Sequence, residues 1–424
     1  MNCPADLRTG PAAGRPRTAP APALTPALTM LFSATVGVIV LNLFAAQPLT
    51  GPIAAELRLP ASLTGLVAML PQLGYAAGLV LLVPLVDLLE NRRLIVTTLA
   101  VCAATLALPA VTRSGAVYLA AVFAAGAASS VIQMLVPMAA SMAPDERRGR
   151  AVGNVMSGLM LGILLSRPLA SLIAGAAGWR AFYGAAAAAA ADIAIAAVLA
   201  AKLPLRAPQL STRYAALLRS LWTLVATERV LQRRALSAAL SMAAFSAFWT
   251  AIGLRLAAAP FDLGLHGIAM FAFAGATGAI VTPFAGLAGD RGRERDALRG
   301  AHVAMLAALA ALGVAGAGWG GFDTAAHPAL ALALLVVGAA ALDAGVVADQ
   351  TLGRRAINLL DPAMRGRLNG LFVGLFFVGG SLGAVLAGAA WAWAGWGAVC
   401  AVGLVFAGAA FALDWIGAHG PAPR

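Results

Sequence analysis

The sequence predicts an all-α integral membrane protein in which twelve transmembrane helices form two parallel six-helix bundles. Three observations support this fold class: long apolar segments, a one-sided distribution of basic residues and an internal repeat. The chain has 424 residues, of which 61% are hydrophobic and only 11% are charged. Its mean hydropathy of +0.87 lies well above that of soluble domains. The apolar segments also reach the length of roughly 20 residues that a helix needs to cross a bilayer.

These apolar segments are spread along the whole chain, and each is long enough to span the hydrocarbon core as a helix. The twelve predicted spans are 28–48, 62–84, 94–112, 116–142, 151–176, 181–203, 235–257, 265–288, 301–319, 328–350, 368–392 and 396–416. Together they use well over half of the chain. The loops that are left are too short to hold a soluble domain.

The basic residues indicate how the spans are oriented. If both termini and every second loop lie inside the cell, the inside set holds 24 of the 29 Lys and Arg residues and the outer loops hold four. Cytoplasmic loops of membrane proteins carry such an excess. We therefore expect both termini to be cytoplasmic. The net charge of +12 then serves topology and contact with anionic lipids, and no binding of nucleic acid is expected.

The second half of the chain repeats the first at a fixed offset. The motif RGR at 148–150 recurs at 365–367, Gln133 recurs as Gln350, and the pair Gly178–Trp179 recurs as Gly395–Trp396, all at the same offset of 217. Because six spans bring the chain back to its starting side, the halves are parallel repeats related by an axis along the membrane normal. Two bundles of this kind can rock about a shared cavity and expose it to each side in turn.

The repeat sets the expected domain organisation. It comprises a disordered cytoplasmic tail at 1–27, an N-terminal bundle at 28–203, a cytoplasmic connector at 204–234, a C-terminal bundle at 235–416 and a tail at 417–424. Within the connector, 214–234 has helical periodicity. That pattern fits either a helix lying along the membrane surface or a solvated linker.

The charged loops carry a resemblance to a known family. Residues 286–293, GLAGDRGR, resemble the loop after span 2 in the major facilitator superfamily of secondary transporters, G-x-L-x-D-R-x-G-R-R. The matching residues are Gly286, Asp290, Arg291, Gly292 and Arg293, and in the first-half copy Asp87, Arg92 and Arg93. The resemblance extends from about residue 40 to 400. It implies the fold of that family, a small-molecule substrate and a monomer in a lipid bilayer.

Finer features resemble the bacterial efflux branch of that family, whose members are often called sugar- or drug-efflux permeases. The segments concerned are 47–57, 71–95, 143–172 and 365–384. Span 5 also carries a variant of the antiporter pattern G-x-x-x-G-P, with Ser166 for the second Gly and Arg167 before Pro168. The resemblance implies efflux of a drug, sugar or metabolite across the bacterial inner membrane, with protons as the coupling ion. An uptake permease of the same fold is the alternative.

The resemblance also implies a role for the charged loops as a cytoplasmic gate. In that fold span 2 closes on span 11 and span 8 closes on span 5. Asp87 would then meet the helix start near Arg367, and Asp290 would meet the helix start near Arg150. A carboxylate beside a helix N-terminus gains about 0.3–1 kcal/mol. The alternative is a loop whose charges only obey topology.

Charged residues inside spans are expensive and mark candidate functional positions. Asp343 in span 10 is the first candidate for a proton-coupling carboxylate, because burial favours the protonated form of a carboxyl group. Asp349 and Arg167 are the further proton-coupling candidates, and Asp349 lies nearer the inside and is expected to be solvated. Arg167 in span 5 is placed to bind an anionic substrate, pair with a carboxylate or snorkel to the surface. A purely structural role is the alternative for each aspartate.

Polar and aromatic residues in the central spans are candidates for the wall of the cavity. They are Asn42, Gln47, Gln72, Tyr75, Gln133, Trp249, Gln350 and Phe376. Gln133 and Gln350 form the most persuasive pair, because the repeat places both beside the axis. Each residue alone could instead hydrogen-bond a neighbouring helix.

Other classes of protein leave patterns that this chain lacks. None of its four His residues has metal-ligand spacing to another, and it contains neither GxxxxGK[ST] nor GxSxG. We therefore expect no metal, no cofactor and no enzymatic activity. A polytopic membrane enzyme and a sensor without transport activity are the less favoured alternatives.

Overall fold

The computed structural model of the chain describes residues 25–144, 147–199, 213–361 and 364–417, and these residues fold as helices and short loops. The helices of the first half are α1 (Pro26–Phe44), α2 (Thr50–Glu56), η1 (Ala61–Leu63), α3 (Leu66–Leu81), η2 (Val83–Asp87), α4 (Asn91–Val111), α5 (Gly115–Ala128), η3 (Ser129–Val131), α6 (Ile132–Met142), α7 (Arg148–Ala177) and α8 (Trp179–Leu199). Those of the second half are α9 (Tyr214–Thr227), α10 (Arg229–Ala257), α11 (Leu265–Ala272), η5 (Phe273–Ala276), α12 (Thr277–Asp290), α13 (Glu294–Ala317), η6 (Trp319–Gly321), α14 (Pro328–Asn358) and α15 (Arg365–Gly417).

The predicted twelve spans are all present as helical segments. Among the described residues, ten helices are long and apolar enough to cross a membrane. The last of these, α15, loses helical geometry at Ala394 and Gly395 and so supplies two crossings. The 21-residue helix α8 supplies the remaining one. Several spans are broken into short 3₁₀ and α pieces; span 4, for example, consists of α5, η3 and α6.

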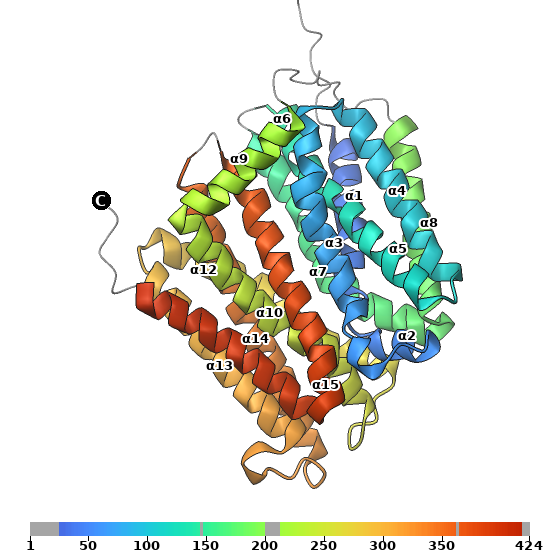
Figure 1. Cartoon of the computed structure of the whole chain (residues 1–424), viewed down its shortest axis with the longest axis vertical. Helices are drawn as coiled ribbons and strands as arrows, with labels where there is room; N and C mark the ends of the chain where they lie inside the picture. The colour runs from blue at the N-terminus through green and yellow to red at the C-terminus, as the bar shows by residue number, and fades with distance from the viewer. Residues whose placement is uncertain (1–24, 145–146, 200–212, 362–363, 418–424) are drawn as a thin grey trace, which may run out of the picture.

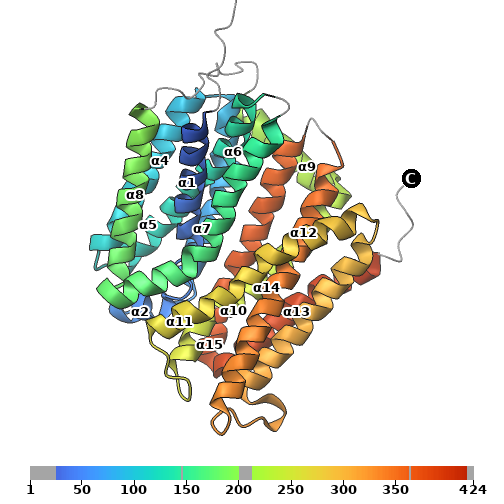
Figure 2. The ribbon, with the colours of Figure 1, turned by 180° about the vertical axis from the view of Figure 1, so that it is seen from behind.

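The two halves of the chain form two bundles that lie side by side, as the blue-to-green and yellow-to-red segments of Figures 1 and 2 show. The repeat seen in the sequence is visible in their geometry. Gly178 ends α7 with φ of 83°, and Gly395 breaks α15 with φ of 67°. Both angles lie in the region that glycine adopts without steric cost. The repeated Gly-Trp pair therefore makes the same turn between the fifth and sixth spans of each half.

Repeated glycines also make the same helix crossing in both bundles. A Cβ atom at Gly162 of α7 would lie 2.3 Å from the carbonyl oxygen of Gly37 in α1, and one at Gly379 would lie 2.0 Å from that of Ala239 in α10. Only glycine allows backbones to approach this closely. Not every glycine has this function, since a Cβ at Gly370 would meet nothing within 4 Å.

The connector is helical where the structure describes it. Leu217, Leu221 and Leu224 of α9 are buried, whereas Trp222 on the other face is 73% exposed. The helix therefore packs one apolar face on the bundles. It ends at Thr227, and α10 begins at Arg229, several residues before the predicted start of span 7 at 235.

One end of the molecule carries the arginine-rich loops, among them the starts of α7 and α15, and is called the basic end here. At the opposite end the bundles are joined. Thr50 Oγ1 donates to the carbonyl oxygen of Thr250 at 3.0 Å, and Gln72 Nε2 donates to Ser246 Oγ at 2.9 Å. A Cβ at Gly65 would lie 2.2 Å from the carbonyl oxygen of Ala384. The bundles therefore touch backbone to backbone at this closed end.

Polar contacts also join α2 to α8 at the closed end. Trp179 Nε1 donates to Glu56 Oε2 at 2.6 Å, and Arg180 donates to the same carboxylate. These hydrogen bonds, with that of Trp179 the larger influence, hold the pKa of the Glu56 carboxyl below its usual value. The first Trp of the repeated Gly-Trp pair thus fixes α2 to α8.

Candidate functional site: a cavity between the bundles

A cavity of about 910 Å³ lies between the two bundles. At the basic end its wall includes Asn358, Arg365 and Asn369, and Arg365 is exposed, so the cavity is open on that side. Four of the predicted cavity residues line it: Tyr75, Gln133, Gln350 and Phe376. Gln133 Nε2 lies 3.1 Å from Tyr75 Oη and donates to it. The repeated glutamines thus face the same space from opposite bundles.

Two charged residues from opposite bundles face the deep part of this cavity. Arg167 of α7 is 3% exposed and Asp343 of α14 is 4% exposed, and both line the wall. Trp249 Nε1 donates a hydrogen bond of 2.8 Å to Asp343 Oδ1, which orients the carboxylate. A Cβ atom at Gly275 would lie 2.9 Å from Asp343 Oδ2 and 3.6 Å from Arg167 Nη1. Both charged groups therefore border the small space beside Gly275.

The surroundings of Arg167 offset the cost of burying its charge. Arg167 Nε donates to Gln47 Oε1 at 2.7 Å. The guanidinium carbon lies 4.3 Å from the ring centre of Trp249, 5.0 Å from that of Phe245 and 5.2 Å from that of Phe44. Aromatic faces attract cations, most strongly when water is excluded. Arg167 Nη2 is buried without a hydrogen-bond partner among the described residues.

The structure corrects the prediction for four cavity residues. Asn42, Gln47, Gln72 and Trp249 are buried but are not part of the cavity wall. The reason is that these side chains make their hydrogen bonds inside the protein, and Asn42 donates to the carbonyl oxygen of Ile39 in its own helix. Gln72 joins the two bundles through Ser246, and Gln47 and Trp249 hold Arg167 and Asp343 from behind.

Sequence reasoning missed several residues of the wall. Arg354 and Asn358 line the cavity from the end of α14, and Phe44 and Phe245 line it near Arg167. A helical signal was available for the first two, because positions 343, 347, 350, 354 and 358 recur every three or four residues and so share one helix face. The aromatic residues left no comparable signal, since apolar rings occur on every face of a span.

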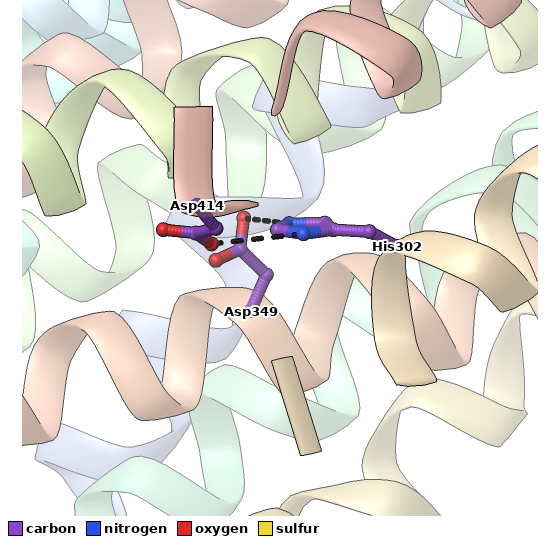
Figure 3. A group of neighbouring side chains, drawn as sticks. All are labelled: His302, Asp349 and Asp414. Atoms are coloured by element: carbon purple, nitrogen blue, oxygen red, sulfur yellow. Dashed lines mark ion pairs between the residues drawn. The ribbon is translucent and has the colours of Figure 1, made fainter. Parts of the chain in front are cut away.

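Asp349 does not belong to this cavity, which corrects the expectation that water solvates it. Its side chain is fully buried on another face of α14. Ser241 Oγ donates to its Oδ2 at 2.6 Å. With His302 and Asp414 it forms a group that is called the buried triad here. One imidazole nitrogen and one oxygen of each carboxylate lie within 4.8 Å of one another. Figure 3 shows the three side chains converging from separate helices.

At the basic end, the partner of Asp290 differs from the predicted one. Asp290 Oδ1 lies 3.2 Å from Arg355 Nη2 of its own bundle, not beside Arg150. Arg150 instead borders a groove of about 870 Å³ between α1 and α7. Asp87 and Arg367 are exposed. Because the cavity is open at this end, the contacts between bundles stay a prediction for a closed state.

Comparison with known proteins shows which family this chain resembles in sequence. The sequence profile of the Major Facilitator Superfamily matches residues 28–357. The transporter YgaY of Escherichia coli O157:H7 is 35% identical over 402 residues, which cover 95% of this chain and 98% of YgaY.

Solved structures agree in fold. A bacterial homologue of the human lysosomal transporter Spinster superimposes with a TM-score of 0.70 at 14% identity, covering 93% of this chain and 98% of that one. The nucleoside transporter NupG superimposes with a TM-score of 0.67 at 15% identity, covering 92% of this chain and 97% of that one.

Proposed function

The chain belongs to the Major Facilitator Superfamily of membrane transporters, and on that premise we propose that it exports a small organic molecule in exchange for protons. The observation that carries this proposal is the placement of Arg167 and Asp343. They come from opposite bundles and face one cavity at the level where the bundles meet. A rearrangement of the bundles would therefore change the surroundings of both charges at once.

Alternating access supplies the movement. The cavity is open at the basic end, and contacts such as Thr50 with Thr250 join the bundles at the other end. Rocking of the two repeats would break these contacts and close the basic end, with the binding residues near the middle of the membrane. The carboxylate of Asp343 is the group that takes up and releases the proton during this cycle.

Competition between substrate and proton for Arg167 and Asp343 would couple the transport of the substrate to that of the proton. A polar group of the substrate, such as a hydroxyl, could accept a hydrogen bond from Arg167 and donate one to Asp343 while the Asp343 carboxylate is ionised. A protonated Asp343 loses the charge that favours this hydrogen bond. Proton and substrate would thus exclude each other at the pair, as exchange requires. A charge-assisted hydrogen bond of this kind contributes about 1.5–3 kcal/mol.

The wall of the cavity suggests what the substrate looks like. Phe44, Phe245, Phe376 and Phe377 offer apolar contact, and Arg167 offers a donor to an anionic or other hydrogen-bond-accepting group. We propose a mostly apolar molecule with one polar group that accepts from Arg167 and donates to the ionised carboxylate of Asp343. A hydrophobic cation would instead use Asp343 as its partner, and a sugar would use the glutamines and Tyr75.

A deletion strain challenged with a broad compound panel would identify the substrate. Everted inner-membrane vesicles carrying the protein would then test direction and coupling. We expect substrate to accumulate inside everted vesicles when respiration acidifies them, and an uncoupler to abolish the accumulation. Accumulation in right-side-out vesicles would favour uptake instead. Flux that does not change when the proton gradient is removed would contradict the proposed coupling.

The location that goes with this function is the bacterial inner membrane, with the basic end and both termini in the cytoplasm. The protein is proposed to act as a monomer with no partner other than lipid. Accessibility of tags placed on the two ends tests the orientation. Tags that react from opposite sides of the membrane would exclude a twelve-span arrangement with both ends inside.

Substitution of Gly275 tests the space beside the charged pair without changing any charge. In Gly275→Ala the added methyl group would lie 2.9 Å from Asp343 Oδ2 and 3.3 Å from Trp249 Cζ2. We expect it to displace the carboxylate and to raise the substrate concentration for half-maximal transport about tenfold or more. Gly408→Ala is the matched control, because a Cβ there meets nothing within 4 Å. Unchanged transport in Gly275→Ala would show that the substrate does not use this space.

The gate at the basic end is proposed as a latch that closes when Asp290 leaves Arg355 and meets the start of α7 near Arg150. In Asp290→Ala we expect the state that is open at the basic end to gain about two- to fivefold in population, because the closed state loses the carboxylate at the helix start. The open state loses the ion pair with Arg355, but the Asp290 side chain is 69% exposed there, so that pair contributes little. Spin-label distances between α7 and α12 would measure the populations. Asp323→Ala, in an exposed loop at the closed end, is the control. Equal populations in both variants would show that Asp290 does not act as a latch.

A further inference from the structure

The buried triad lies inside the C-terminal bundle, outside the cavity wall. His302 of α13 and Asp349 of α14 have fully buried side chains, and the side chain of Asp414, near the end of α15, is 7% exposed. His302 Nε2 lies 3.6 Å from Asp349 Oδ2, and His302 Nδ1 lies 3.6 Å from Asp414 Oδ2 (Figure 3). A buried imidazole is thus flanked by two carboxylates at its two nitrogens.

This arrangement decides the protonation state of the ring. Neither nitrogen of His302 has a hydrogen-bond partner among the described residues, so both are available to the carboxylates. A neutral imidazole has one N–H and one lone pair, whereas the imidazolium has two N–H donors. In the neutral form a lone pair would face a carboxylate oxygen across a dry contact. The imidazolium can donate one N–H to each of the two carboxylates.

The charges around the triad also favour the imidazolium form of His302. Asp414 Oδ1 lies 3.3 Å from Arg234 Nη1 and 3.6 Å from Arg233 Nη2. Arg234 Nη2 also binds Glu294 Oε1 at 2.8 Å. Three carboxylates, of Asp349, Asp414 and Glu294, therefore share two guanidinium groups. One negative charge is left inside the bundle, and an uncompensated buried charge is strongly destabilising.

Two further arginines lie nearby, and neither forms an ion pair with the triad among the described residues. Arg299 lies over the ring of Trp415, with its guanidinium carbon 4.9 Å from the ring centre. Arg355 pairs with Asp290, with Nη2 to Oδ1 at 3.2 Å, and reaches Glu294 only at 3.9 Å. Besides Arg233 and Arg234, α10 offers the triad hydroxyl groups: Ser241 donates to Asp349, and Ser237 lies 3.3 Å from Asp414 Oδ2. Hydroxyl groups satisfy carboxylate oxygens but add no charge.

We propose that His302, Asp349 and Asp414 form a proton-binding site inside the C-terminal bundle, in which His302 is held doubly protonated between the two carboxylates. A divalent metal ion fits this geometry less well, because it binds one nitrogen lone pair and brings two positive charges where one is missing. The bound proton joins α13, α14 and α15. Through Arg234, Glu294 and Arg355 the same network reaches Asp290 at the basic end. The site depends neither on the identity of the substrate nor on the direction of transport.

Histidine-selective NMR of the full-length protein in lipid nanodiscs tests the proposal directly. The chain has only four His residues, so ¹⁵N-labelled histidine gives few signals, and His302→Gln assigns the one that matters. We expect His302 to show two protonated nitrogens at pH 7, and to show one in Asp414→Asn. The exposed His327 serves as the control. A singly protonated His302 in the unaltered protein, or a signal that changes when a chelator removes a bound metal ion, would overturn the proposal.

Thermal unfolding provides a second readout that a packing role would not produce. His302→Gln alone leaves a negative charge uncompensated, whereas the double variant His302→Gln with Asp349→Asn removes one charge of each sign. We expect the double variant to have a higher Tm than His302→Gln alone, although it carries more changes. His327→Gln should leave Tm unchanged. A double variant less stable than the single one would contradict the charge balance on which the site rests.

Discussion

A covalent bridge between the two bundles at their closed end is expected to stop transport completely. Thr50 and Thr250 are positions where the bundles are in contact, since Thr50 Oγ1 lies 3.0 Å from the carbonyl oxygen of Thr250. The variant Thr50→Cys with Thr250→Cys would be made in a background without Cys3, Cys102 and Cys400. Oxidation would fix the bundles in the state that is open at the basic end. Flux in vesicles should fall to background and return when a reductant opens the bridge.

The controls for this experiment separate the bridge from the substitutions. Each single cysteine variant should transport before and after oxidation. A double variant with both cysteines in one bundle should also keep its activity, because a bridge there does not prevent rocking. Full transport by the bridged Thr50–Thr250 variant would mean that the bundles need not separate at this end, and alternating access by rocking would be excluded.

Replacing Asp343 by Asn is expected to have the second large effect. The amide keeps the size of the carboxylate and can still accept the hydrogen bond that Trp249 Nε1 donates at 2.8 Å. It cannot take up a proton. We therefore expect accumulation of substrate driven by the proton gradient to fall to the level of uncoupler-treated vesicles. Exchange of substrate between equal concentrations on the two sides should persist, because it needs no proton.

Two matched variants make the Asp343 result specific. Asp343→Glu keeps a titratable carboxyl group and should restore part of the coupling. Asp192→Asn makes the same chemical change at an exposed position of α8 and should have no effect. Undiminished coupling in Asp343→Asn would assign the proton to another group. Loss of exchange together with coupling would point to a role in substrate binding.

The cavity pair and the buried triad are joined by one helix. Asp343 and Asp349 both belong to α14, but Asp343 lines the cavity whereas Asp349 faces His302. Six residues along an α-helix correspond to a rotation of about 240°, so the two carboxylates point to different sides. A shift of α14 during transport would therefore disturb both proton sites.

The sequence by itself determined the fold and the repeat. Twelve apolar segments of sufficient length leave few alternatives to twelve spans, because backbone groups in a membrane must be satisfied within each helix. Repeated residues located the shared features correctly: Gln133 and Gln350 face one cavity, and Gly178 and Gly395 make equivalent turns. Arg167 and Asp343 could be chosen because a charge in an apolar segment is visible in the sequence alone.

The tertiary structure alone decided which polar side chains meet. Nothing local distinguishes Gln72, which joins the bundles, from Gln133, which lines the cavity. His302 stood among apolar residues without ligand spacing to any other group, and its partners lie 47 and 112 positions further along the chain. Span length and charge are properties of a segment, so the sequence contains them. Burial and pairing depend on how several helices are rotated against one another, which only the packing of the whole bundle sets.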